Sequence, residues 1–224
     1  TTGRQWAALW VLAAALAMIV LDGTIVAVAL PAIIADLHLD LTDAQWVNSL
    51  YAVLLAALLL STGRLSDRWG RKRLFLVGIV IFIGGSILAA MSDASGPLIA
   101  ARAVQAGGAA LIMPSTLSTV NATFRGKYRA TAFGVWGAVI SGAAAIGPLA
   151  GGALTQWGSW EWIFLVNIPL GAIVFVAAIF TVKETRGGKA LPGADVDGAL
   201  LSAIGFGALV FAVIEGPEIG WWVP

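Results

Sequence analysis

Long apolar stretches separated by short charged segments run the length of the chain. Five of these stretches contain no charged residue, and two more contain one each. Backbone amides in lipid must bond within their own segment, so apolar stretches near the roughly 20 residues needed to span a bilayer predict transmembrane helices. We predict helices over about 6–35, 44–62, 74–91, 98–121, 129–153, 161–182 and 197–214.

Basic and acidic residues alternate between the segments that separate these stretches. Twelve of the thirteen Lys and Arg residues fall in four segments, which are separated by segments in which acidic residues dominate. Cytoplasmic loops of membrane proteins collect Lys and Arg. The alternation therefore predicts a cytoplasmic N-terminus and seven crossings of the cell's inner (cytoplasmic) membrane. The loops expected outside are 36–43, 93–97, 154–161 and 215–224.

The composition supports the same class. The chain is 59% hydrophobic and 11% charged, whereas about a quarter of the residues of a soluble domain are charged. The net charge of +1 conceals the alternation, and the absence of cysteine leaves no disulfide to consider. We expect an all-α integral membrane protein.

One acidic residue, Asp22, lies in the middle of the predicted helix over 6–35. A charge at the bilayer centre costs about 2.5–3.5 kcal/mol on insertion scales, so it is a functional hypothesis by default. Ala8, Ala15 and Ala29 share its helical stripe at intervals of seven residues, and small residues mark close helix packing. We expect Asp22 to face the bundle interior, either as a proton-exchanging carboxylate or as half of a structural ion pair.

Arg102 is the other charge inside an apolar stretch, near the start of the predicted helix over 98–121. It shares a narrow face of polar and small residues with Gln105, Ala109 and Thr116. In one interpretation Arg102 supports proton exchange at a carboxylate. In the other its side chain extends toward the outer surface to reach water.

The segment GRLSDRWGRKR, residues 63–73, joins two predicted helices. Gly63 and Gly70 permit a tight reversal of the chain, and five cations hold the segment at the cytoplasmic face. Asp67 is its one acidic residue. We expect Asp67 to form a cytoplasmic latch with Arg125 or Arg129.

The predicted helix over 129–153 carries a smooth face of small residues. Its members are Gly137, Ser141, Ala144, Pro148 and Gly151, and Gly147 with Gly151 adds a GxxxG pair. Such a face lets another helix approach closely, and Pro148 favours a kink. The face suits a sealed contact between two moving halves of a protein, or ordinary helix packing in a membrane.

Four of these strings resemble motifs of the major facilitator superfamily. Residues 63–73 resemble its signature loop through Gly63, Leu65, Asp67, Arg68, Gly70, Arg71, Lys72 and Arg73. LDGTIVAVALP resembles the first-helix motif of its drug-exporting branches through Leu21, Asp22, Thr24 and Pro31. ARAVQAGGAA resembles its fourth-helix motif through Arg102, Gln105 and Gly108, with Ala106 where Gly is usual. GAAAIGPLAGG resembles the antiporter motif of the fifth helix through Gly142, Gly147, Pro148, Gly151 and Gly152.

The resemblance covers essentially all of residues 1–183 and implies a fold. This region is expected to form the N-terminal six-helix bundle of the superfamily, built from two inverted three-helix repeats. The segment 184–196, rich in Gly and charge, is the expected cytoplasmic linker. Residues 197–224 would form an additional transmembrane helix with an external end, as in the fourteen-helix drug:proton antiporters. We expect the C-terminal half of such a transporter to be absent from this chain.

The resemblance also implies a function. We expect proton-coupled efflux of lipophilic, often cationic drugs or dyes by alternating access, with Asp22 and Arg102 in proton coupling. The expected conformational gate comprises Gly63, Asp67, Arg68, Gly70, Arg71, Arg125 and Arg129. The expected substrate cavity comprises Asp22, Thr24, Asn48, Gln105, Thr116 and Ser141. Two alternatives stay open, a dedicated exporter of one endogenous metabolite or lipid precursor and a non-transporting membrane sensor.

Other functional classes lack their residues in this sequence. The sequence has no G-x-x-x-x-G-K-[ST] string to bind ATP in a P-loop, and its single His38 lies in a predicted outer loop. We see no His, Cys and carboxylate cluster for a metal and no nucleophile–base pair for catalysis. We therefore predict a protein that is not an enzyme, with no cofactor, no metal and no nucleic-acid partner. Its expected partners are drugs, protons, the lipid bilayer and the C-terminal half.

Overall fold

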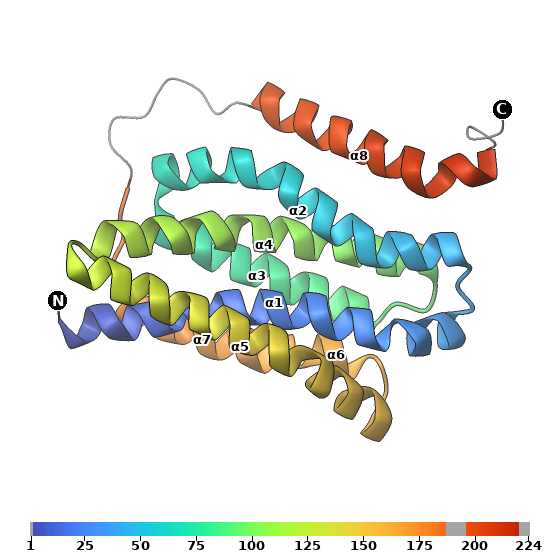
Figure 1. The fold of residues 1–224 in the computed structure, drawn as a ribbon, viewed down its shortest axis with the longest axis horizontal. Helices are drawn as coiled ribbons and strands as arrows, with labels where there is room; N and C mark the ends of the chain where they lie inside the picture. Colours follow the sequence, from blue (N-terminus) through green and yellow to red (C-terminus); the bar gives the residue numbers. More distant parts are fainter. Residues whose placement is uncertain (1, 187–195, 220–224) are drawn as a thin grey trace.

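A computed structural model describes residues 2–186 and 196–219, and helices are the regular elements of this part of the chain (Figure 1). Their bounds are α1 Gly3–Leu37, α2 Leu41–Trp69, α3 Arg71–Ala90, α4 Ser95–Thr123, α5 Lys127–Trp157, α6 Trp162–Leu165, α7 Asn167–Thr181 and α8 Val196–Ile219. The prediction of an all-α fold is confirmed. Most of the predicted linker over 184–196 lies outside the described residues.

The lengths of the helices agree with membrane crossing. Five helical segments of the described chain are long and apolar enough to span a membrane, with α6 and α7 counted together. The bent helix α2, which turns by 54° between Leu59 and Ser61, makes a sixth. A helix also occupies the seventh predicted position, as α8, but a seventh crossing stays a prediction.

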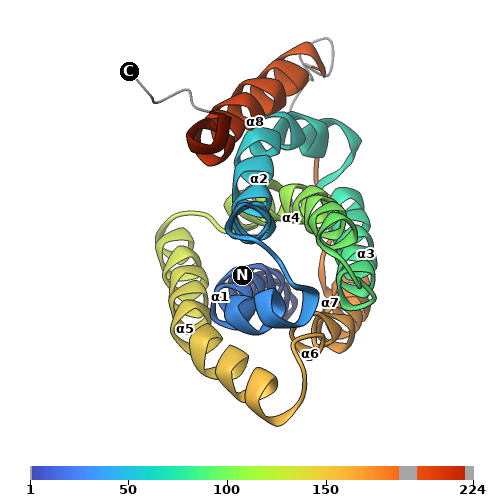
Figure 2. The same ribbon diagram turned by 90° about the vertical axis from the view of Figure 1, so that its right-hand side faces the viewer.

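The helices pack side by side with their axes roughly aligned (Figures 1 and 2). The closest pairs are α3 with α4, α1 with α5, and α2 with α4, while α8 packs against α2. Trp46 of α2 donates a hydrogen bond of 3.1 Å from Nε1 to Glu215 Oε1 of α8. Figure 2 shows α1 flanked by α5 on one side and by α6 and α7 on the other.

Two apolar clusters form the core, one toward each end of the bundle. The α1 members of the first cluster lie between Ala8 and Ile19. The α1 members of the second cluster lie between Ile25 and Ile33. Asp22 lies between these two sets and is itself buried. The fold therefore places this carboxylate at mid-helix, between two hydrophobic layers.

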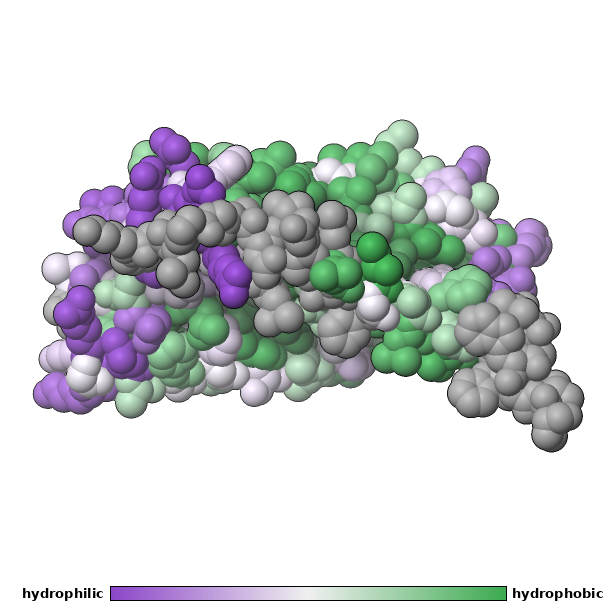
Figure 3. Space-filling model, turned by 90° about the horizontal axis from the view of Figure 1, so that it is seen from above, coloured by the Kyte–Doolittle hydropathy of each residue, from purple (hydrophilic) through white to green (hydrophobic). Residues whose placement is uncertain are grey.

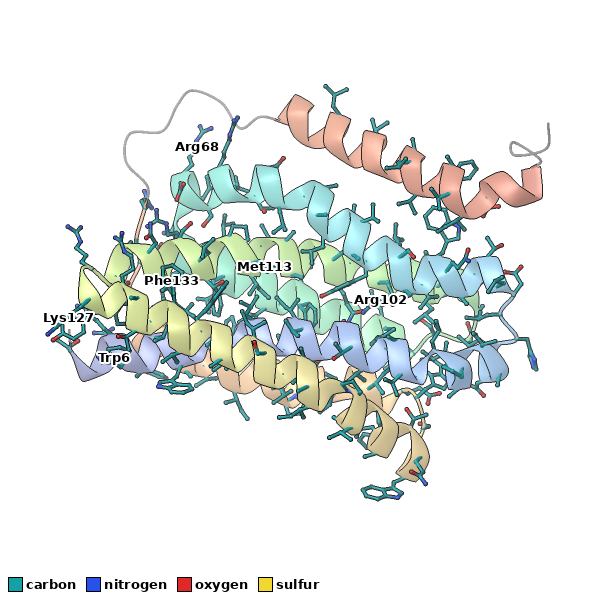
Figure 4. The ribbon with its side chains drawn as sticks, in the orientation of Figure 1. Trp6, Arg68, Arg102, Met113, Lys127 and Phe133 are labelled. Atoms are coloured by element: carbon teal, nitrogen blue, oxygen red, sulfur yellow. The ribbon has the colours of Figure 1, made fainter. Side chains whose placement is uncertain are left out.

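Charged side chains collect at the two ends of the molecule. Figure 3 shows a hydrophobic band between ends where hydrophilic side chains gather. Figure 4 places Arg68 and Lys127 at the same end as Trp6, near the N-terminus, and Arg102 in the interior. The start of α1, the α2–α3 and α4–α5 connections and the end of α7 meet at that end. The charged segments of the sequence thus lie at the two ends of the bundle, with the hydrophobic band between them.

The predicted helix over 161–182 is interrupted. The structure ends α6 at Leu165 and begins α7 at Asn167. Pro169 has no backbone N–H to donate to Leu165, so the hydrogen-bond ladder is broken beside the interruption. The break leaves Asn167 as the first residue of α7, facing the bundle interior and 2% exposed.

Candidate functional site

The two charges inside the apolar stretches meet in the bundle interior. Asp22 of α1 is 1% exposed and Arg102 of α4 is fully buried. Arg102 Nη1 donates to Asp22 Oδ2 at 2.5 Å and to Gln105 Oε1 at 2.9 Å. The prediction that Asp22 faces the interior is confirmed. The interpretation in which Arg102 extends to the outer surface is wrong, because its charge is satisfied by Asp22 instead of by water.

The uncharged residues Asn167 and Ser86 complete this buried network. Asn167 Nδ2 of α7 lies 3.2 Å from both Asp22 Oδ1 and Ser86 Oγ of α3. Gln105 Nε2 donates to Ser86 Oγ at 2.9 Å and lies 3.5 Å from Asp22 Oδ1. The network therefore joins α1, α3, α4 and α7, with contacts to both the Asp22 carboxylate and the Ser86 hydroxyl.

The pairing determines what the carboxylate can do. A buried ion pair is held by its hydrogen bonds, and removing one partner costs about 3–5 kcal/mol because the other charge is left uncompensated. A proton added to Asp22 would neutralise it and weaken its hold on Arg102. Protonation of Asp22 would thus release a constraint between α1 and α4.

An aromatic ring covers the guanidinium of Arg102. The ring centroid of Tyr51 in α2 lies 4.0 Å from Arg102 Cζ, which is within the range of a cation–π contact. Arg102 Nε also lies 3.4 Å from the carbonyl oxygen of Val47. The position of Tyr51 was not predicted from the sequence.

The other residues of the predicted substrate cavity are dispersed. Asn48 is exposed and lines a cavity beside Tyr51. The Thr24 hydroxyl donates to backbone carbonyls of its own helix. Thr116 is buried and donates to the carbonyl of Met113 at 2.7 Å, and Ser141 lies exposed on α5. The structure thus unites Asp22 and Gln105, and leaves Thr24, Thr116 and Ser141 outside the network.

The contacts at the end of the bundle near the N-terminus differ from the predicted latch. Asp67 pairs with Arg71 at 2.8 Å, and its expected contact with Arg125 or Arg129 is not formed. Arg71 lies four residues further along the chain and begins α3 after Gly70. Arg129 instead donates to the carbonyls of Phe124 and Asn121.

The same end contains a helix cap supplied from a distant part of the sequence. The two carboxylate oxygens of Glu184 accept hydrogen bonds from the backbone N–H groups of Lys72 at 3.1 Å and Arg73 at 3.2 Å. A negative charge at the N-terminus of α3 accepts hydrogen bonds from free N–H groups and interacts favourably with the positive end of the helix dipole. Gly70 has φ of +111°, a backbone conformation that favours glycine, and a Cβ there would collide with the Glu184 carboxylate. The predicted gate residue Gly70 therefore has a direct geometric role.

The GxxxG pair of α5 packs against α1. A Cβ on Gly147 would collide with the Thr24 side chain, and one on Gly151 would lie 3.2 Å from Ile25 Cα. The prediction of a closely approaching helix is confirmed, and the partner lies within the same bundle. Ser141, Ala144 and Pro148 of the same helix are exposed.

An ion pair buried between the first and fourth helices of a membrane bundle is a functional-site hypothesis by default. The family model of the Major Facilitator Superfamily matches residues 12–217, and the chain belongs to this superfamily. It is accordingly a multi-pass membrane protein. Membership favours a transporter over an enzyme.

Several curated relatives are similar over nearly the whole chain. An uncharacterized MFS-type transporter of Mycobacterium tuberculosis is 41% identical and is matched over 98% of this chain and 38% of its own length. The tetracenomycin C resistance and export protein of Streptomyces glaucescens is 36% identical, over 98% and 41%. The puromycin resistance protein pur8 of Streptomyces alboniger is 40% identical, over 99% and 44%. The chain spans less than half the length of each of these relatives.

Solved structures with little sequence similarity share the fold. The crystal structure of peptide transporter POT in complex with sulfate superposes with a TM-score of 0.72 at 20% identity, over 99% of this chain and 47% of that chain. A bacterial homologue of the human lysosomal transporter Spinster gives a TM-score of 0.69 at 21% identity, over 86% and 46%. These similarities establish the arrangement of the helices.

Proposed function

We propose that the protein containing this chain exports lipophilic, often cationic drugs from the cell in exchange for protons. The observation that carries the proposal is the buried Asp22–Arg102 pair, since an ionisable residue within a membrane span marks a pathway for ions or substrates. The relatives named for tetracenomycin and puromycin resistance support drug efflux. The motif around Asp22, which resembles that of drug-exporting branches, supports proton coupling.

The proposed cycle uses one carboxylate in two states. Facing the cytoplasm, deprotonated Asp22 pairs with Arg102 and the bundle accepts a drug. Facing outward, Asp22 takes a proton, its attraction to Arg102 weakens, and the drug is released. Alternating access in this superfamily moves one half of the transporter against the other around a central site. The glycine-lined α1–α5 contact would keep these two helices together as one body during that movement.

Proton-driven dye uptake tests this function. Everted membrane vesicles containing the whole protein, acidified inside, should accumulate ethidium or a neutral lipophilic dye, and a protonophore should abolish the accumulation. Vesicles without the protein are the control. A dedicated exporter of one metabolite would ignore most dyes, and a membrane sensor would move none. Uptake that ignores the proton gradient would contradict proton coupling.

Cysteine labelling tests the proposed orientation in the inner membrane. Residues 1–224 contain no cysteine, so within this part of the protein each introduced residue reports alone. Because basic loops stay in the cytoplasm, Asp40→Cys should react with a membrane-impermeant maleimide added to intact cells. Lys127→Cys should react only in everted vesicles. Labelling of Lys127→Cys from outside would overturn the proposed cytoplasmic N-terminus.

A further inference from the structure

A small cavity adjoins the buried ion pair on the side of α2. Its volume is about 290 Å³, and its lining includes Gly23 of α1, Asn48, Tyr51 and Ala52 of α2, and Arg102 of α4. A Cβ on Gly23 would meet nothing within 4 Å, so the space beside this glycine is open. Asn48 and Ala52 are exposed, on a stripe of α2 separate from Trp46, which contacts α8.

Two polar atoms at this wall lack hydrogen-bond partners in the described part of the chain. They are Tyr51 Oη and Arg102 Nη2, and both are buried. Tyr51 is 6% exposed and Arg102 is fully buried. An unsatisfied buried donor is unfavourable, and each one in a native protein calls for an explanation. Both groups can donate a hydrogen bond to an oxygen atom.

The electrostatics of this wall differ from those expected for a cation site. Arg102 compensates the negative charge of Asp22 through a hydrogen bond from Nη1 to Oδ2. Asn167 contacts the other carboxylate oxygen of Asp22. The cavity lining includes Arg102, the Tyr51 ring that lies 4.0 Å from its Cζ, and Asn48. The wall therefore offers hydrogen-bond donors and no free carboxylate.

We propose that Tyr51, Arg102 and Asn48 form a subsite for a carbonyl-type oxygen, such as a ketone or quinone oxygen, on a lipophilic substrate. The subsite rests on the proposed efflux function and adds a chemical class to it. Both unpaired atoms are buried on residues that line the cavity, so a ligand oxygen reaches them only with a movement of the Tyr51 side chain. Leu55 and Leu59 supply an apolar wall for the body of the ligand.

Binding of two dyes to the whole protein tests this subsite. Quinizarin, a neutral dihydroxyanthraquinone, supplies quinone oxygens, and ethidium is a cation without a carbonyl group. Tyr51→Phe removes one hydroxyl and keeps the ring over Arg102. We expect it to weaken quinizarin binding about fivefold to tenfold, as for the loss of one buried hydrogen bond, and to weaken ethidium binding less.

Two variants accompany this comparison. Tyr128→Phe alters the chain's other tyrosine, which is exposed at the start of α5 and contacts Lys127, and it should change neither dye. Ala52→Leu places a larger side chain at an exposed position on the cavity wall without altering a polar group. It should also weaken quinizarin binding, which confirms that the dye occupies this cavity.

The outcomes separate the subsite from the efflux function. A larger loss of quinizarin binding than of ethidium binding in Tyr51→Phe supports the subsite. Unchanged quinizarin binding in Tyr51→Phe, or equal weakening of both dyes, overturns it. Wild-type protein that exports ethidium but does not bind quinizarin overturns the subsite and leaves the efflux function standing. Wild-type protein that moves neither dye in response to a proton gradient overturns the efflux function, and the subsite with it.

Discussion

Replacing Asp22 with Asn should reduce proton-driven dye uptake to the level of vesicles without the protein. Asn has nearly the same shape as Asp but has no carboxylate to take up a proton. In the structure this carboxylate contacts Arg102 and Asn167, so the substitution also leaves the fully buried Arg102 without a counter-charge. That loss costs about 3–5 kcal/mol for a buried pair. Uptake should be measured in everted vesicles and normalised to the amount of inserted protein.

Two further variants distinguish a lost proton site from a destabilised bundle. Asp22→Glu keeps a carboxylate and should retain part of the uptake. Asp22→Asn combined with Arg102→Gln removes both charges, so no uncompensated charge is left buried. The double variant should therefore regain much of the thermal stability that Asp22→Asn loses, without regaining coupled uptake. Uptake near the wild-type rate in Asp22→Asn would refute the assignment of proton coupling to this residue.

Charge patterning made the fold and the two charged members of the buried network predictable. Asp22 and Arg102 each interrupt an apolar stretch, and a charge in a membrane span is costly enough to require a partner. Ser86 and Asn167 are uncharged, so the charge pattern does not identify them. Each is a polar residue within a charge-free stretch, and that is the signal that could have identified them, because polar side chains in membrane helices bond to neighbouring helices.

Contacts between distant segments were less predictable. The spacing of Gly147 and Gly151 indicated that some helix approaches closely, but one helix's spacing cannot identify the partner, which proved to be α1. The cap on α3 comes from Glu184, more than a hundred residues further along the chain, and no local pattern encodes such a contact.

Replacing Gly108 with Ala should destabilise the bundle, whereas the same change at the neighbouring Gly107 should not. A Cβ on Gly108 would lie 2.6 Å from the backbone nitrogen of Phe82 and 2.7 Å from the carbonyl oxygen of Gly78, so α3 and α4 would have to move apart. A Cβ on Gly107 would meet nothing within 4 Å. Overpacking costs typically about 1–3 kcal/mol, and the better helix propensity of Ala returns about 1 kcal/mol at either position.

The consequences of Gly108→Ala should extend to the buried network. Ser86 of α3 bonds to Gln105 of α4, so separating these two helices lengthens a contact that positions the Asp22 carboxylate. We expect a lower unfolding temperature in detergent and slower proton-driven uptake for Gly108→Ala, with Gly107→Ala equal to or slightly more stable than wild type. Equal stability of the two variants would show that the close approach of α3 and α4 can relax without cost. The packing of these helices would then not be what holds the network in place.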